Sequence, residues 1–166
     1  MKMRFFILIL LAIVILVFGG MKKAEVKEID DKIKEAEKCF FSMMGRVDNP
    51  TKGFKLLLEA IEMAAPHTGF SPEFKDKIVK VRKLSKETSI LNPEGFALLD
   101  EAYRSINSGK AFEIPESISK IEDAVAYCHS QIETARKDLK QGNYNNSVKL
   151  LLETCLMIVT PFERKK

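Results

Sequence analysis

Four prolines recur along the chain at nearly equal intervals. Pro50, Pro72, Pro93 and Pro115 are separated by 22, 21 and 22 residues. Three of them follow a residue whose side chain can cap a helix, namely Asn49, Ser71 and Asn92. Proline is tolerated at the first helical position because the N–H there has no intrahelical partner. Each proline therefore predicts the start of a helix.

The four prolines predict four helix starts, and we expect one more helix after the hydrophobic leader and one after "QGNYNN". The sequence thus predicts six helices, with an irregular link at 109–114. Their expected ranges are 23–47, 50–65, 72–88, 93–108, 115–140 and 144–160. Trp is absent, and the alternation of apolar and polar residues that marks strands is missing outside the leader. With 166 residues and 46% hydrophobic content, the chain can bury one core. The sequence predicts an all-α domain of three antiparallel hairpins.

Two of these helices carry apolar residues at alternating steps of three and four. In the first they are Val26, Ile29, Ile33, Ala36, Phe40, Met43 and Val47, and in the fifth Ile118, Ile121, Val125, Cys128, Ile132, Ala135 and Leu139. Such seams bury one helix face against a partner. The carboxylates Asp30, Asp31, Glu35 and Glu37 are interpreted as part of the solvated face of the first helix.

The second, fourth and sixth helices share a pattern. It reads "GFKLLLEAI" at 53–61, "GFALLDEAY" at 95–103 and "SVKLLLETC" at 147–155. A small residue opens each copy (Gly53, Gly95, Ser147), and a leucine follows four positions later (Leu57, Leu99, Leu151). Recurrence of this kind predicts hairpins that bury their faces against one another, as a repeat array or a six-helix bundle.

The segment "ARKDLKQGNYNNSVKLLLETCLMIVTP" at 135–161 resembles a tetratricopeptide repeat. Ala135 stands at the small position of the first helix, and Gly142, Asn143 and Tyr144 stand at the turn. Ser147, Leu151 and Thr154 follow the small, large, small series of the second helix. The good match is confined to this segment. The resemblance implies a tetratricopeptide-like hairpin array whose job is protein interaction or scaffolding.

The N-terminus reads "MKMRFFILILLAIVILVFGGMKK". Lys2 and Arg4 precede an unbroken apolar run from Phe5 to Phe18. Residues 1–22 are therefore a signal peptide or an N-terminal membrane anchor, with a buried core helix as the third alternative. No small-residue cleavage site follows the run, which favours the anchor. Either of the first two alternatives places the helical domain at 23–166 outside the cytoplasm, membrane-tethered or secreted.

The sequence carries no pattern of catalytic, metal-binding or cofactor-binding residues. There are two histidines, His67 and His129, which we interpret as a loop residue and a bundle-surface residue. Nucleophile, metal and phosphate-binding motifs are absent, so we expect no enzyme, no metal and no cofactor. The formal net charge of +4 includes Lys2 and Arg4 of the leader and indicates no nucleic-acid partner.

Cys128 and Cys155 fall at nearly equal heights if the last two helices turn back at Gly142. They could form a disulfide or remain two reduced core residues, and both alternatives stay open. Cys39 has no histidine placed by the sequence to activate it.

Four aromatic residues on or beside the repeated helices are candidate partner-binding residues: Phe54, Phe96, Tyr103 and Tyr144. We expect the two tyrosines to be more exposed than the two phenylalanines, beside a groove flanked by the second, fourth and sixth helices. The predicted function is an extracytoplasmic protein-interaction or scaffold domain that binds protein partners. The alternative is a helical sensor whose closed pocket holds a small ligand.

Overall fold

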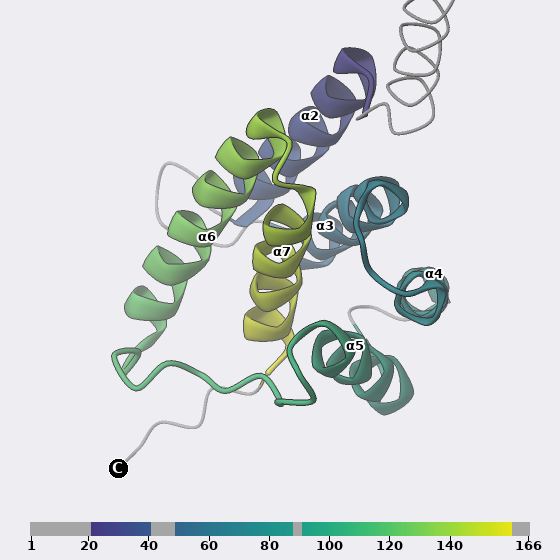
Figure 1. Ribbon diagram of the computed structural model, residues 1–166. Coiled ribbons are helices and arrows are strands. Elements are labelled where there is room, and N and C mark those ends of the chain that lie inside the picture. Colours follow the sequence, from purple (N-terminus) through teal and green to yellow (C-terminus); the bar gives the residue numbers. More distant parts are fainter. Residues whose placement is uncertain (1–20, 41–48, 88–90, 161–166) are drawn as a thin grey trace, which may run out of the picture.

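The computed structural model describes residues 21–40, 49–87 and 91–160, and these are helical with no strand. The helices are α2 (Lys23–Phe40), α3 (Pro50–Ala64), α4 (Pro72–Glu87), α5 (Pro93–Ile106), α6 (Ile121–Gln141) and α7 (Tyr144–Val159), with a short 3-10 turn η1 (Ala65–His67) after α3 (Figure 1). The all-α prediction is confirmed over this part of the chain.

Three of the four predicted proline starts are confirmed, each with its cap. Asn49 Oδ1 accepts a hydrogen bond from Lys52 N at 3.0 Å, and Asn92 Oδ1 accepts one from Gly95 N at 2.8 Å. Ser71 Oγ accepts one from Phe74 N at 3.2 Å. These side chains satisfy backbone donors that have no partner inside the helix.

The fourth start is wrong, because α6 begins at Ile121 and not at Pro115. Pro115 follows Ile114, which has no side-chain oxygen to serve as a cap. The segment before α6 instead packs Phe112, Ile114 and Ile118 against Cys128 and Met157 in a small second core. Ile118 thus joins that core from the link, and Ile121, expected on the buried seam, is 56% exposed.

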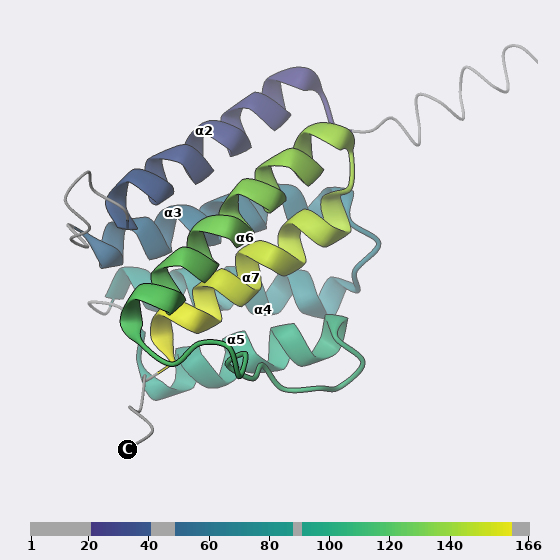
Figure 2. The same ribbon diagram turned by 90° about the vertical axis from the view of Figure 1, so that its left-hand side faces the viewer.

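The six described helices pair as three antiparallel hairpins, α2–α3, α4–α5 and α6–α7 (Figures 1 and 2). Gly142, with a φ of 82°, ends α6 in the left-handed region that favours glycine and allows the tight turn into α7. Further contacts join α3 to α4 and α7, α2 to α6, and α5 to α7. Two four-helix groups therefore share α3 and α7: α2, α3, α7 and α6 form one, and α3, α4, α5 and α7 form the other.

This arrangement explains why "KLLLE" occurs in α3 and again in α7. A helix shared by two groups must be apolar over a wide arc, because it meets three neighbours. Leu57 and Leu58 of α3 and Leu151 and Leu152 of α7 are all fully buried. The third copy, in α5, lies at the edge: of its two leucines only Leu99 is buried, Leu98 is partly exposed, and Phe96 is 37% exposed.

The small residues that open the three copies are all buried. A Cβ atom added at Gly53 would lie 2.6 Å from Cζ of Phe40 on α2, which is closer than atoms can approach. Gly53 therefore lets α2 pack closely on α3, as the pattern predicts. The seam of α2 is buried at Ile29, Ile33, Ala36 and Phe40. Its expected continuation, Met43 and Val47, lies outside the described residues.

Residues 1–20 also lie outside the described part, so the predictions of an N-terminal hydrophobic helix and of a signal or anchor remain predictions. Met21 is 7% exposed and belongs to the main core. The described packing thus begins at Met21, within the segment 1–22 that is predicted to be a signal peptide or an anchor. Among the helices of residues 21–40, 49–87 and 91–160, none combines the length and the hydropathy needed to span a membrane.

Candidate functional site

The four aromatic residues predicted to bind a partner do not gather at one surface. Phe54 is fully buried, as expected, and Tyr144 is partly exposed. The expectation for the other pair is wrong, because Tyr103 is 6% exposed and Phe96 is 37% exposed. The Tyr103 ring packs edge to face against the ring of Phe112, with the two centroids 5.8 Å apart, and its hydroxyl forms a hydrogen bond with α7.

That hydrogen bond is part of a polar cluster between α5, α6 and α7. Tyr103 donates to Glu153 Oε1 at 3.1 Å, and Gln131 Nε2 donates to Glu153 Oε2 at 2.9 Å and to the Tyr127 hydroxyl at 2.7 Å. Burial raises the pKa of Tyr103, and the neighbouring Glu153 carboxylate raises it further. Tyr103 therefore stays a neutral donor that joins α5 to α7.

Tyr144 lies at the start of α7 beside His67 of η1. The two rings meet edge to face with their centroids 6.1 Å apart. They line an open hollow of about 350 Å³ together with Gly142, Asn143, Asn145 and Asn146. Asn145 Oδ1 accepts a hydrogen bond from Gly69 N at 3.0 Å and so ties this turn to the loop after η1. His67, expected to be an exposed loop residue, is thus partly covered.

Cys128 and Cys155 are both buried and are free thiols in the structure, the second of the two alternatives left open by the sequence. They belong to different clusters, since Cys128 packs in the small second core and Cys155 in the main core. Burial raises the pKa of Cys128 to about 12. Burial, followed by the proximity of Cys128, also raises the pKa of Cys155. Neither thiol is prepared for nucleophilic chemistry.

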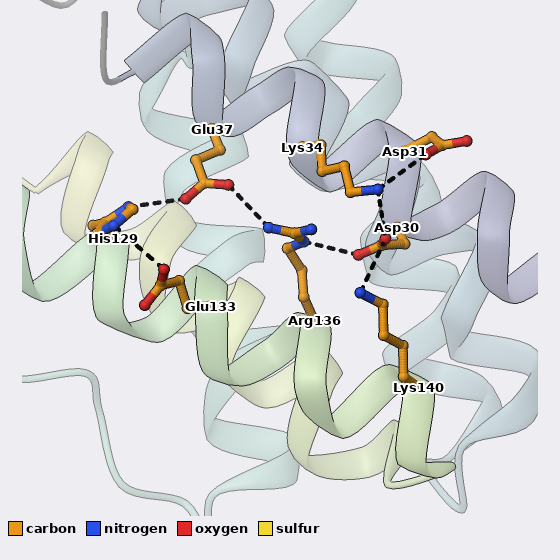
Figure 3. Close-up of polar contacts among 8 residues, drawn as sticks. All are labelled: Asp30, Asp31, Lys34, Glu37, His129, Glu133, Arg136 and Lys140. Atoms are coloured by element: carbon orange, nitrogen blue, oxygen red, sulfur yellow. Dashed lines mark hydrogen bonds and ion pairs between the residues drawn. The ribbon is translucent and has the colours of Figure 1, made fainter. Parts of the chain in front are cut away.

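The interface between α2 and α6 contains an ion-pair cluster that the sequence had assigned to a solvated face (Figure 3). The Asp30 side chain is only 6% exposed and faces three cations. Arg136 Nε donates to its Oδ1 at 2.8 Å, while Lys34 Nζ and Lys140 Nζ lie 3.0 and 3.3 Å from Oδ2. Burial acts to raise the pKa of Asp30, but the hydrogen bonds from Arg136 and Lys34 outweigh it and hold that pKa below its usual value.

The same cluster continues to a histidine flanked by two glutamates. Arg136 Nη1 donates to Glu37 Oε2 at 3.3 Å, and Glu37 Oε1 lies 2.9 Å from His129 Nδ1. His129 Nε2 lies 3.6 Å from Oε1 of Glu133, four residues further along α6. One ligand atom from each of Glu37, His129 and Glu133 can be chosen so that all three lie within 4.8 Å of one another. This set could hold a metal ion.

Two signals in the sequence point toward this cluster. His129 and Glu133 are spaced to share a helix face, and "IKEAEK" at 33–38 aligns with "IETARK" at 132–137 at an offset of 99 residues. Glu37 and Arg136 are separated by this same offset and are in contact. Similarity between the segments 33–38 and 132–137 does not imply that they are in contact. The sequence alone therefore did not predict this cluster.

A groove was expected along α3, α5 and α7; among these helices, α7 lies between the other two and contacts both (Figure 1). An open groove of about 580 Å³ lies instead over α3, with α2 and α4 as its walls. It is lined by Glu28, Lys32, Glu59, Glu62, Met63 and Arg82. Lys32 Nζ of α2 lies 2.8 Å from Glu59 Oε2, and Arg82 Nη2 of α4 donates to Glu62 Oε1 at 3.1 Å. Cations from both walls therefore pair with carboxylates on the floor.

No protein-family model, no curated protein and no solved structure matches this chain. What the chain does must therefore be inferred from its own geometry and charge.

Proposed function

We propose that this chain is a protein-interaction or scaffold domain that binds a protein partner in the groove over α3. The proposal includes its placement outside the cytoplasm, tethered by residues 1–22 or secreted if that segment is cleaved. The observation that carries it is the groove itself, a concave surface formed by the first two hairpins and lined by both signs of charge. A protein segment is the ligand class that can match such mixed charge along a helix-lined groove.

The side chains of the groove fit this use. Met63 is a partly buried, flexible apolar residue on the floor, of the type that adapts to a partner. Glu59 and Lys32 keep 34% and 27% of their side-chain surface exposed, so their ion pair can exchange for pairs with an incoming chain. We therefore expect a partner segment with an apolar anchor flanked by charged residues.

The tetratricopeptide-like resemblance at 135–161 remains part of the proposal as a hairpin, formed by α6 and α7. A linear array would keep its first and last hairpins apart, whereas here α2 contacts α6 and α3 contacts α7. The finer fold that we propose is therefore a closed six-helix bundle built from tetratricopeptide-like hairpins.

The sensor alternative has less support. It requires a closed pocket lined by Phe54, Phe96 and Cys155, but Phe54 and Cys155 have no exposed surface and Phe96 lies at the protein surface. The two hollows described above are both open. We propose no catalytic activity. A crosslinking experiment can test the protein-binding function against the sensor function.

Site-specific photocrosslinking tests the groove. A photoreactive amino acid at Met63 should yield a discrete adduct with one partner in native membranes or medium, and Lys32→Gln or Arg82→Gln should weaken it. The matched control places the same group at Ile121, which is 56% exposed on α6, a helix that contributes no residue to the groove. Equal crosslinking from both positions, or none from Met63, would contradict the groove as the binding surface.

A further inference from the structure

We propose that Glu37, His129 and Glu133 form a binding site for a divalent transition-metal ion, with Zn²⁺ as the best match. The site would link α2 to α6 and hence the first hairpin to the last. It shares no residue with the groove over α3 and does not depend on the proposed function.

The ligand set has the composition and spacing of a three-residue site. An imidazole and a carboxylate four residues apart lie one above the other on the same helix face, as His129 and Glu133 do on α6. Glu37 supplies the third ligand from α2, and its Oε1 is already directed at the imidazole (Figure 3). A helix-borne pair and a third ligand from a facing helix are the elements from which metal sites in helical bundles are built.

The distances fit one ion after a side-chain rotation, because Glu37 meets Nδ1 of the His129 ring and Glu133 meets Nε2. Nitrogen and oxygen ligands lie about 2.0–2.2 Å from zinc, so that two ligands of a tetrahedral ion are about 3.4 Å apart. The chosen ligand atoms lie within 4.8 Å of one another. His129 and Glu133 keep 48% and 63% of their side-chain surface exposed, which gives both side chains room to rotate by this amount. The same exposure leaves the fourth coordination position to water.

The surrounding charges accept a cation. Arg136 is directed at the buried Asp30 and at Glu37 Oε2, so its charge is already neutralised and Glu37 Oε1 faces the imidazole. The two groups joined to His129 in Figure 3 are both carboxylates, Glu37 and Glu133, whereas Lys34 and Lys140 pair with Asp30 at the other end of the cluster. The guanidinium also positions Glu37, the role that hydrogen-bond donors behind metal ligands commonly fill.

The donor types select the class of metal. Imidazole with carboxylate suits zinc and its transition-metal neighbours, whereas Ca²⁺ and Mg²⁺ prefer six or more oxygen ligands. Three protein ligands and a water match the coordination number of zinc. We therefore expect Zn²⁺ to bind well in excess of Ca²⁺ and Mg²⁺.

The test uses the full chain, freed of metal and kept in a mild detergent because of its hydrophobic N-terminus. Titration with ZnCl₂ in a calorimeter should give one ion per chain and raise the melting temperature, and Co²⁺ should give visible d–d bands. His129→Ala and Glu133→Gln should each weaken Zn²⁺ binding at least tenfold. The control His67→Ala removes the other histidine of the chain and should leave binding unchanged.

Glu37→Gln tests the link between the helices, because it keeps the shape of the side chain. We expect it to weaken binding at least tenfold and to abolish the rise in melting temperature. The metal-free melting temperature and the far-ultraviolet circular dichroism of each variant show whether it is folded. Absence of one-to-one binding in a large excess of Zn²⁺ would overturn the proposal, as would unchanged affinity in folded His129→Ala, Glu133→Gln or Glu37→Gln protein.

Discussion

Replacing the three equivalent leucines by alanine tests the distinction between central and peripheral helices. Leu57, Leu99 and Leu151 are all fully buried, and the repeated pattern assigns them one position. They differ in their surroundings. The helices of Leu57 and Leu151, α3 and α7, each contact three other helices of the bundle, whereas α5, the helix of Leu99, contacts two.

The expected cost has one shared part and one part that depends on position. Removing the buried carbon atoms of a leucine costs about 2.5 kcal/mol in each variant, at about 0.8 kcal/mol per buried methylene. The cavity left behind adds about 24 cal/mol per Å³ that the surroundings fail to fill. A central helix held by three neighbours cannot move into the space, whereas a peripheral one can shift. We expect about 4–5 kcal/mol for Leu57→Ala and Leu151→Ala, and about 2.5–3.5 kcal/mol for Leu99→Ala.

Urea unfolding of the full chain in mild detergent, followed by far-ultraviolet circular dichroism, measures these differences. Because domains of this kind are stabilised by only about 5–15 kcal/mol, thermal melts should accompany the urea series. Ile121→Ala serves as the control, since that side chain is 56% exposed, and we expect it to change stability by less than about 1 kcal/mol. A cost for Leu99→Ala equal to or above that of the other two would refute the two-group packing. No cost at all would refute the threefold alignment of the sequence.

Three further predictions concern the ion-pair cluster, the cysteines and the leader. The low pKa of Asp30 means that its charge stabilises the fold above the unfolded-state pKa of the carboxyl group, and that this contribution is lost as the pH falls through the lower folded-state value. Asp30→Asn should therefore reduce the acid-side slope of the urea midpoint against pH, and an unchanged slope would assign that dependence elsewhere. Cys128 and Cys155 should resist iodoacetamide in the folded chain and react after denaturation without reductant, whereas a peptide map showing both unlabelled would establish the disulfide. The protein should fractionate with membranes and keep its N-terminus in a mass spectrum, and a start near Gly20 or later would replace the anchor with a cleaved signal.

Much of the local structure was predictable from single residues. Asn49, Ser71 and Asn92 cap α3, α4 and α5 because a side-chain oxygen next to a proline stabilises a helix start without help from distant residues. Pro115 shows the limit of this reasoning. The fixed φ of proline allows a helix to begin but does not require one, and the burial of Phe112, Ile114 and Ile118 against α6 and α7 prevailed there.

The candidate sites were not predictable in the same way. Asp30 and Glu37 have the spacing of a polar helix face, and only the packing of α2 on α6 removes them from water and places Arg136 and His129 opposite them. The groove over α3 likewise depends on which helices flank it. Tyr103, expected to be exposed, is buried where its hydroxyl donates to Glu153 on α7, a partner 50 residues away.

The sequence alone determined where most helices begin, which faces are apolar and that Leu57, Leu99 and Leu151 are buried, because capping and hydrophobic periodicity act within a few residues. The tertiary structure decided which helices are central, which carboxylates are buried and where a groove remains open. Those properties arise from contacts between segments far apart in the chain. Local patterns constrain such contacts weakly, because the same amphipathic face can pack against more than one partner helix.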